Sequence, residues 1–252
     1  MAEKPEEPTL GAFNVGEVPT IAVFDHATTP LGADLGALIA AMQAYVDRSI
    51  VPVWGTPAHL VQTGDFMNDA WAMVFLDDAD QPGALAYHDL TPDGWPLAKV
   101  FVRTAVQNGD PVSVAASHEL VEMLVDPAIN LMSTGPDAAT MYAYESADPV
   151  EQLSFPVNGL AMSDFVYPSY FEAFRKAGST RFDHMGRVDR PFQILSGGYQ
   201  IIFKDGKWSQ IFGSERKARA FAKEDRRGHR SEARGRVLER ADPASVTGAA
   251  RG

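Results

Sequence analysis

The chain has 252 residues, of which 45% are hydrophobic and 10% aromatic, and this composition excludes a disordered protein and suits one large packed domain. It contains no cysteine, which excludes disulfide frameworks, iron–sulfur clusters, thiolate zinc sites and cysteine nucleophiles. Any metal must therefore be held by His, Asp and Glu. The net charge of −11 divides unevenly: residues 213–252 hold 11 of the 22 basic and 6 of the 33 acidic residues, a net of +5, which leaves −16 on residues 1–212.

The polar, Pro- and Gly-containing start predicts a flexible N-terminal segment over residues 1–18, and the charge pattern predicts a basic tail over 213–252 after a folded domain over 19–212. The N-terminus does not resemble a secretory signal, and no apolar run approaches the roughly 18 residues of a membrane span. We therefore expect a cytoplasmic protein with no membrane partner, released by lysis or by a dedicated export machine if it is found elsewhere. The tail, helical or disordered, is expected to be a tether or to dock on an acidic partner, and nucleic acid is not expected because the acidic body repels it.

The first half of the chain alternates strand and helix patterns. Apolar runs predict strands over residues 20–24, 50–54 and 71–76, and apolar residues at helical spacing predict a helix over 34–46. Residues 83–88 and 97–104 flank a Pro-Asp-Gly turn and are expected to form an antiparallel pair. A further helix should begin at Asp110, as N-cap before Pro111, and end near Val125 because Pro127 follows.

The second half is expected to be richer in strands. Strands are predicted over residues 141–145 and 160–162, and a helical segment over 168–175. Residues 200–203 and 208–212 flank Asp205-Gly206, which predicts a β-hairpin near the C-terminal end of the domain.

One segment of the predicted 110–125 helix carries chemistry: Ser117-His118-Glu119-Leu120-Val121-Glu122. Residues four apart on a helix project from one face, so His118 and Glu122 can bind one cation while Glu119 lies beside them. This is the arrangement in which the two outer residues bind a metal and the inner Glu accepts a proton from an activated water.

The alternative is an ordinary charged helix face, because short strings of this kind occur by chance. Against it, His118 and Glu122 fall on or beside the apolar stripe formed by Val114, Val121 and Val125. A carboxylate in that position is costly unless it is paired or bound to a cation. The pattern therefore favours a metal site.

The His118–Glu122 segment resembles the motif helix of zincin-type metallopeptidases, in an HExxE version of their HExxH signature. The chain is also similar to uncharacterised zincin-like proteins of bacteria and their phages, in which motifs like SHELVEMLVDP and YESADPVE occur together. The resemblance covers residues 20–212, anchored at 117–127 and 142–151. It implies an α+β fold: a mixed twisted sheet with packed helices, including the motif helix, and an edge strand around residues 86–89 that aligns an extended peptide.

A catalytic zinc has three protein ligands, so one must come from outside the helix. Zincins of the gluzincin type use a downstream Glu, which makes Glu145 the first choice and Asp148 the second, with an alternative role for Asp148 in orienting His118. His88 is a further candidate, either as a ligand or as a group that assists an oxyanion. Tyr144 or Tyr142 is expected to donate a hydrogen bond to the tetrahedral intermediate, and the sequence does not choose between them.

The resemblance implies a metal-dependent peptidase that acts on a peptide or protein substrate, with Glu119 as general base. Zinc is the expected cofactor, and Mn, Fe or Ca would also suit one imidazole and two carboxylates. The competing interpretation is a non-catalytic structural or binding protein that keeps the zincin fold, for example a component of a phage or secretion particle.

Overall fold

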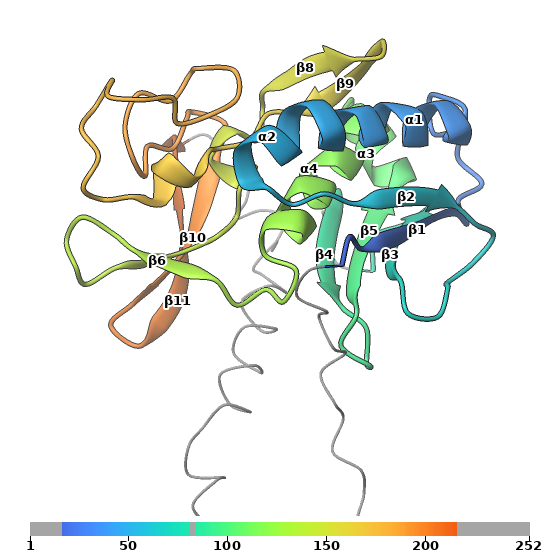
Figure 1. Cartoon of the computed structure of the whole chain (residues 1–252), viewed down its shortest axis with the longest axis horizontal. Helices are drawn as coiled ribbons and strands as arrows, with labels where there is room; N and C mark the ends of the chain where they lie inside the picture. Colours follow the sequence, from blue (N-terminus) through green and yellow to red (C-terminus); the bar gives the residue numbers. More distant parts are fainter. Residues whose placement is uncertain (1–16, 81–83, 216–252) are drawn as a thin grey trace, which may run out of the picture.

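Five strands form the larger sheet of the computed structural model, which describes residues 17–80 and 84–215 (Figure 1). The strands lie in the order β2-β1-β3-β5-β4. Only the β4–β5 pair is antiparallel, so the sheet is mixed. The strand order makes β4 one of its edges. The bounds are β1 Thr20–Asp25, β2 His59–Gln62, β3 Trp71–Leu76, β4 Ala86–Leu90 and β5 Pro96–Phe101.

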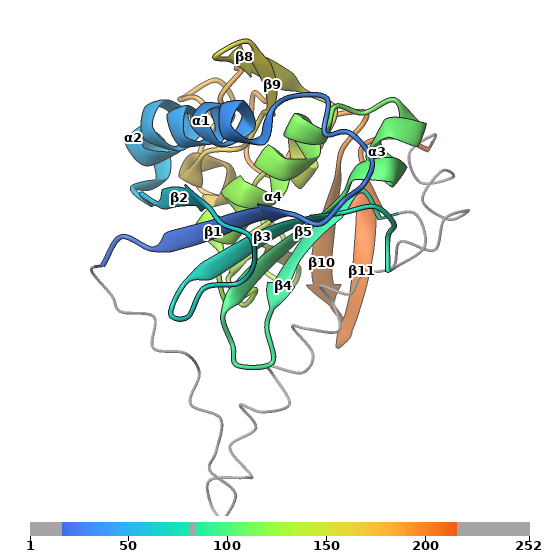
Figure 2. The ribbon, with the colours of Figure 1, turned by 90° about the vertical axis from the view of Figure 1, so that its right-hand side faces the viewer.

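The helices of the described chain cover one face of this sheet (Figure 2). They are α1 Leu35–Tyr45, the π-helical turn η1 Val46–Ile50, α2 Val51–Trp54, α3 Val102–Asn108 and α4 Val112–Val125. The apolar faces of α1 and α4 meet the sheet residues Val23, Met73 and Val100 in the largest core cluster. Burial of these side chains, rather than helix propensity, holds the layers together.

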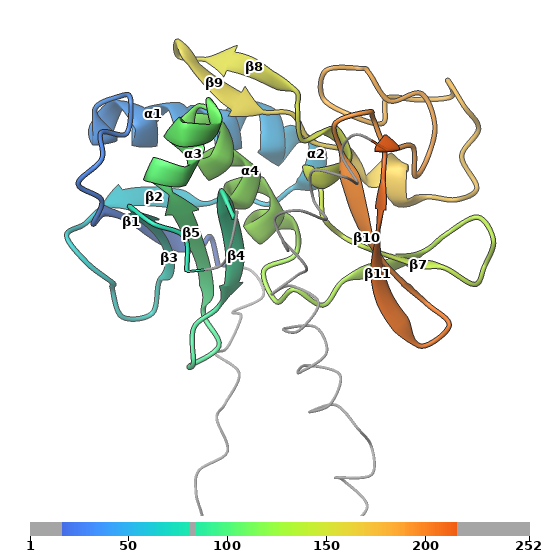
Figure 3. The same cartoon turned by 180° about the vertical axis from the view of Figure 1, so that it is seen from behind.

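A second, antiparallel sheet lies beside the first, in the order β11-β10-β7-β6 (Figure 3). Its strands are β6 Met132–Thr134, β7 Met141–Ala143, β10 Tyr199–Lys204 and β11 Lys207–Phe212. A separate hairpin of β8 Ser154–Val157 and β9 Leu160–Ser163 packs on α1 and α4. Two short 3-10 turns flank it in the sequence, η2 Asp148–Val150 and η3 Pro168–Phe171. The polypeptide between β7 and β8, which contains η2, therefore connects the second sheet to α4.

Most predicted elements are confirmed. The strands at 20–24 and 71–76, the helix at 34–46, the antiparallel pair around the Pro-Asp-Gly turn and the C-terminal hairpin are present within a few residues of their predicted bounds. Asp205 and Gly206 have φ of 52° and 75°, the left-handed conformation that a two-residue hairpin turn requires. The mixed α+β character expected from the sequence is therefore observed.

The predicted strand at 50–54 is wrong, because these residues continue the α1 helix through η1 and α2. Ile50, Val51 and Val53 have the composition of a strand, but Pro52 lies in the first turn of α2, directly after the π-helical turn η1, where a proline is tolerated. The Trp54 indole donates a hydrogen bond to the Val166 carbonyl, which fixes the end of the helix from a distant segment. Tertiary contacts thus override local propensity here.

Three boundaries also differ from the prediction. Residues 102–104 begin α3 instead of extending the β5 strand, and the helical segment predicted over 168–175 shortens to η3. The N-cap of α4 is Pro111 and not Asp110, with no side-chain capping bond. The predicted segment 1–18 lies largely, and the basic tail over 213–252 almost wholly, outside the described residues.

None of the helices in the described part of the chain combines the length and the hydropathy that a membrane crossing needs.

Two fully buried tyrosines test how much hydrogen bonding contributes to this core. The Tyr45 hydroxyl donates to the Ser163 carbonyl over 2.9 Å and joins α1 to β9, whereas the Tyr170 hydroxyl makes no hydrogen bond within the described residues. Tyr45→Phe should lower the free energy of unfolding by about 1 kcal/mol, because it leaves a buried carbonyl without its donor. Tyr170→Phe, the matched control, should leave the stability unchanged or raise it. Urea denaturation measures both, and equal losses in the two variants would contradict the prediction.

Candidate metal centre

Helix α4 buries the charged motif that the sequence places on it. Glu119 is 3% exposed and Glu122 is 0% exposed, while the His118 side chain keeps 12% exposure. The helix packs against β4, β5 and β9, so its motif faces the interior on more than one side. Two carboxylates in such a position require compensating charge or hydrogen bonds.

The first group of neighbouring ligand atoms is a triad formed by His118, Glu122 and Asp148. The His118 Nε2 atom lies 3.1 Å from Asp148 Oδ1 and 3.5 Å from Glu122 Oε1, and the three ligand atoms all lie within 4.8 Å of one another. Ligands of a tetrahedral zinc, bonded at 2.0–2.2 Å, stand about 3.3–3.6 Å apart. The spacing therefore fits one divalent cation between the imidazole and the two carboxylates.

Asp148 reaches this triad from η2, thirty positions beyond His118. A carboxylate that only orients a metal-binding histidine contacts the ring nitrogen that faces away from the metal. Here Asp148 and Glu122 both face the same nitrogen, Nε2. The backbone N–H of Ala147 also donates to Glu122 Oε1 over 3.1 Å, which fixes the carboxylate and the start of η2 together.

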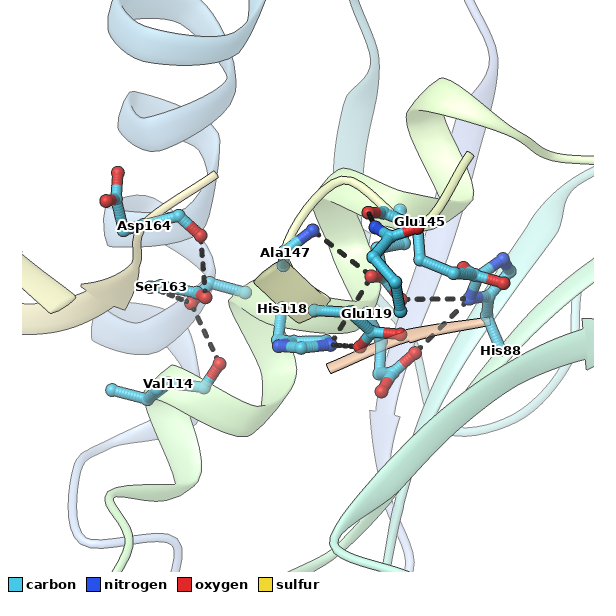
Figure 4. A network of polar contacts seen from close by, with 12 residues as sticks. His88, Val114, His118, Glu119, Glu145, Ala147, Ser163 and Asp164 are labelled. Carbon is cyan, nitrogen blue, oxygen red and sulfur yellow. Dashed lines mark hydrogen bonds and ion pairs between the residues drawn. The ribbon is translucent and has the colours of Figure 1, made fainter. Parts of the chain in front are cut away.

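The second triad contains His88, Glu119 and Glu122, and so shares Glu122 with the first. His88 Nδ1 lies 3.2 Å from Glu119 Oε2 and 3.8 Å from Glu122 Oε2. Figure 4 shows His118 and His88 on opposite sides, with Glu119 between them. His88 comes from β4, where it is paired with Ala98 of β5 and is 1% exposed. The edge strand of the sheet therefore contributes directly to the buried polar cluster.

The charges of the cluster act on the His118 imidazole. Burial by itself lowers the pKa of His118, but the negative charge of Glu122, the bond to Asp148 and the charge of Glu119 outweigh it and hold that pKa well above its ordinary value. The carboxylates thus attract positive charge to this point, whether a proton or a cation supplies it.

The remaining predicted site residues lie differently. Glu145, the first choice for the third ligand, is fully buried but belongs to neither triad. The Tyr144 ring stacks on Phe171, with centroids 4.1 Å apart, and burial and then the charge of Glu172 raise the pKa of its hydroxyl. The Tyr142 ring packs on Phe192. The roles predicted for Glu145, Tyr144 and Tyr142 stay predictions. Of the predicted site residues, the two triads bring together His88, His118, Glu119, Glu122 and Asp148.

Sequence reasoning missed the residue that positions the motif, Ser117. Its hydroxyl donates to the Ser113 carbonyl over 2.7 Å and accepts the Ser163 backbone N–H over 2.8 Å. This contact ties the turn of α4 before His118 to β9. A serine inside a helix gives no signal by itself, because the partner strand is 46 residues away.

A separate pair of buried carboxylates, Asp164 and Asp183, fixes the irregular segment that follows η3. Asp164 Oδ1 accepts the N–H groups of Phe165 and Met185, while Asp183 accepts those of Arg187 and Val188. Burial and the neighbouring charge of Asp183 raise the pKa of Asp164 to about 8. The folded protein therefore keeps a proton on Asp164 at neutral pH.

Comparison of the chain with protein-family models, with curated proteins and with solved structures gave no match.

The proton on Asp164 predicts how stability depends on pH. Because the pKa of Asp164 is raised on folding, the folded state binds one more proton than the unfolded state from about pH 4 to about pH 8, and the unfolding free energy should fall as pH rises through that range. Asp164→Asn mimics the protonated group and should remove this part of the dependence. Urea denaturation of both proteins from about pH 5 to about pH 8.5 measures the difference. Parallel curves would contradict the assignment.

Proposed function

We propose that this protein is a metal-dependent hydrolase of peptide bonds with a zincin-like active site. The observation that carries the proposal is the triad of His118, Glu122 and Asp148 with Glu119 one residue from the first ligand on the same helix. Imidazole and carboxylate ligands suit zinc, and also manganese or iron. When bound there, a divalent cation supplies Lewis-acid polarisation of a carbonyl and of a water molecule.

Glu119 is the proposed general base. Its carboxylate lies within the cluster but outside the His118 triad, so it is available to take a proton from the attacking water and pass it to the leaving amine. His88, 3.2 Å from Glu119 Oε2, fixes the orientation of that carboxylate. Glu122 and Asp148 would hold a cation by their negative charge, and His118 would bind it as the neutral imidazole after releasing the proton that these carboxylates favour.

The position of β4 supports a peptide as the substrate. β4 is an antiparallel edge strand of the larger sheet, and it lies next to α4. An extended peptide can pair with such an edge through its main chain, which would place it alongside the motif helix. A mixed sheet with an antiparallel edge strand beside the motif helix is the arrangement expected of a zincin-like fold. His118 is the most exposed member of the two triads, so substrate would approach from its side.

A second candidate function is structural, and the burial of the site favours it. The side chains of His88, Glu122 and Asp148 are fully buried, as in metal sites that stabilise a fold. A cation held there would pin η2 and β4 to α4 without turnover. Both candidate functions expect metal removal to lower the melting temperature, but only the first expects peptide hydrolysis. A hydrolysis assay therefore distinguishes them.

Glu119→Gln tests the hydrolytic mechanism. The amide cannot accept the proton, so cleavage of a peptide library should fall by about 10²–10⁴-fold. The variant should still bind a cation at His118, Glu122 and Asp148, as metal analysis after dialysis would show. Glu172→Gln makes the same chemical change at a surface ion pair with Arg175 and should leave the rate unchanged. Full activity in Glu119→Gln would overturn the mechanism, and a chelator-resistant wild-type activity would overturn the metal dependence.

A further inference from the structure

We propose that His88, Glu119 and Glu122 form a second binding site for a divalent transition-metal ion, and that Glu122 bridges it to the site at His118. The binding part of this inference does not depend on hydrolysis. Only its effect on the rate rests on the proposed function.

The second triad has the donor set and spacing of a metal site. The ligand atoms of His88, Glu119 and Glu122 lie within 4.8 Å of one another, and all three residues are buried. The distances from His88 Nδ1 to the two carboxylates are 3.2 and 3.8 Å, close to the separation of ligands around one cation. One nitrogen and two carboxylate oxygens suit Mn²⁺, Fe²⁺ or Zn²⁺.

Glu122 presents one oxygen to each site. Its Oε1 atom lies 3.5 Å from His118 Nε2, and its Oε2 atom lies 3.8 Å from His88 Nδ1. Cations of two-metal sites stand about 3.5–4 Å apart, a distance that a single bridging carboxylate can span. A carboxylate oxygen carries two lone pairs, so the hydrogen bond from the Ala147 N–H to Oε1 is compatible with a metal at the same oxygen.

The charge balance also favours two cations. Glu119, Glu122, Glu145 and Asp148 are all buried, and Figure 4 draws Glu145 within the same polar network. Protonation of both imidazoles would offset two of these four carboxylate charges, and one divalent cation with neutral imidazoles would also offset two. Two divalent cations with neutral imidazoles offset all four, so that the buried cluster carries no net charge.

Occupation of the second site would change the proposed reaction. A cation bound to Glu119 Oε2 lowers the proton affinity of that carboxylate, so Glu119 becomes a weaker base. Hydrolysis should therefore rise with the first equivalent of metal and fall with the second.

The test is the metal stoichiometry of the chelator-stripped full chain, titrated with Zn²⁺ by calorimetry and checked by metal analysis. Wild type should bind one cation more than either His88→Ala or His88→Phe, the second of which fills the buried space of the ring. Asp148→Asn should lose the other cation, and Glu122→Gln should lose both. His59→Ala removes an exposed histidine of β2 and should bind as many cations as wild type.

The Mn²⁺-loaded proteins give a second readout. A carboxylate-bridged pair should produce an exchange-coupled EPR signal in wild type that is absent from both His88 variants, whose folding is checked by circular dichroism. Equal stoichiometry in wild type and the His88 variants, or two uncoupled Mn²⁺ signals in wild type, would overturn the bridged site. Loss of a cation in His88→Ala but not in His118→Ala would instead contradict the proposed function and leave the second site standing.

Discussion

The cost of burying the carboxylates of α4 shapes the rest of this structure. Glu119 and Glu122 point into an interior where an ionised group is stable only beside opposite charge or hydrogen-bond donors. The chain meets this requirement with the imidazole of His118 on α4 itself, the imidazole of His88 on β4 and the N–H of Ala147. The arrangement of β4 and η2 around α4 follows from the same requirement, because each delivers one of these groups.

The three segments that meet at the cluster come from different layers. β4 belongs to the larger sheet, α4 lies on the face of that sheet, and η2 leads from the second sheet towards the β8–β9 hairpin. Ser117 and Tyr45 fix the hairpin to α4 and α1 through Ser163. The site is thus held by packed elements on several sides, which is the preorganisation that both a catalytic and a structural metal site need.

The buried Asp164–Asp183 pair shows the same problem solved in another way. There the structure keeps one carboxyl protonated and supplies backbone N–H groups to both residues. At α4 the His88 and His118 imidazoles lie 3.2 and 3.1 Å from a carboxylate oxygen, close enough for an imidazole and a carboxylate to bind one cation. The chemistry of the partner therefore distinguishes a cluster suited to metal from one suited to a shared proton.

The sequence by itself determined the elements whose patterns are local. The apolar run of β3, the Asp-Gly turn of the last hairpin and the proline after α4 each depend on neighbouring residues alone, and all were predicted correctly. The same holds for the pairing of His118 with Glu122, because helix geometry fixes which residues four positions apart share a face.

Only the tertiary structure decided which distant groups lie beside the α4 carboxylates and His118. Asp148 rather than Glu145 faces His118, and His88 reaches the carboxylates because β4 pairs with β5 at the edge of the sheet. Residues 50–54 became helical for the same kind of reason, since contacts with residues more than a hundred positions away outweigh their strand-like composition. Spacing along the chain cannot report such contacts, because they depend on how the layers pack.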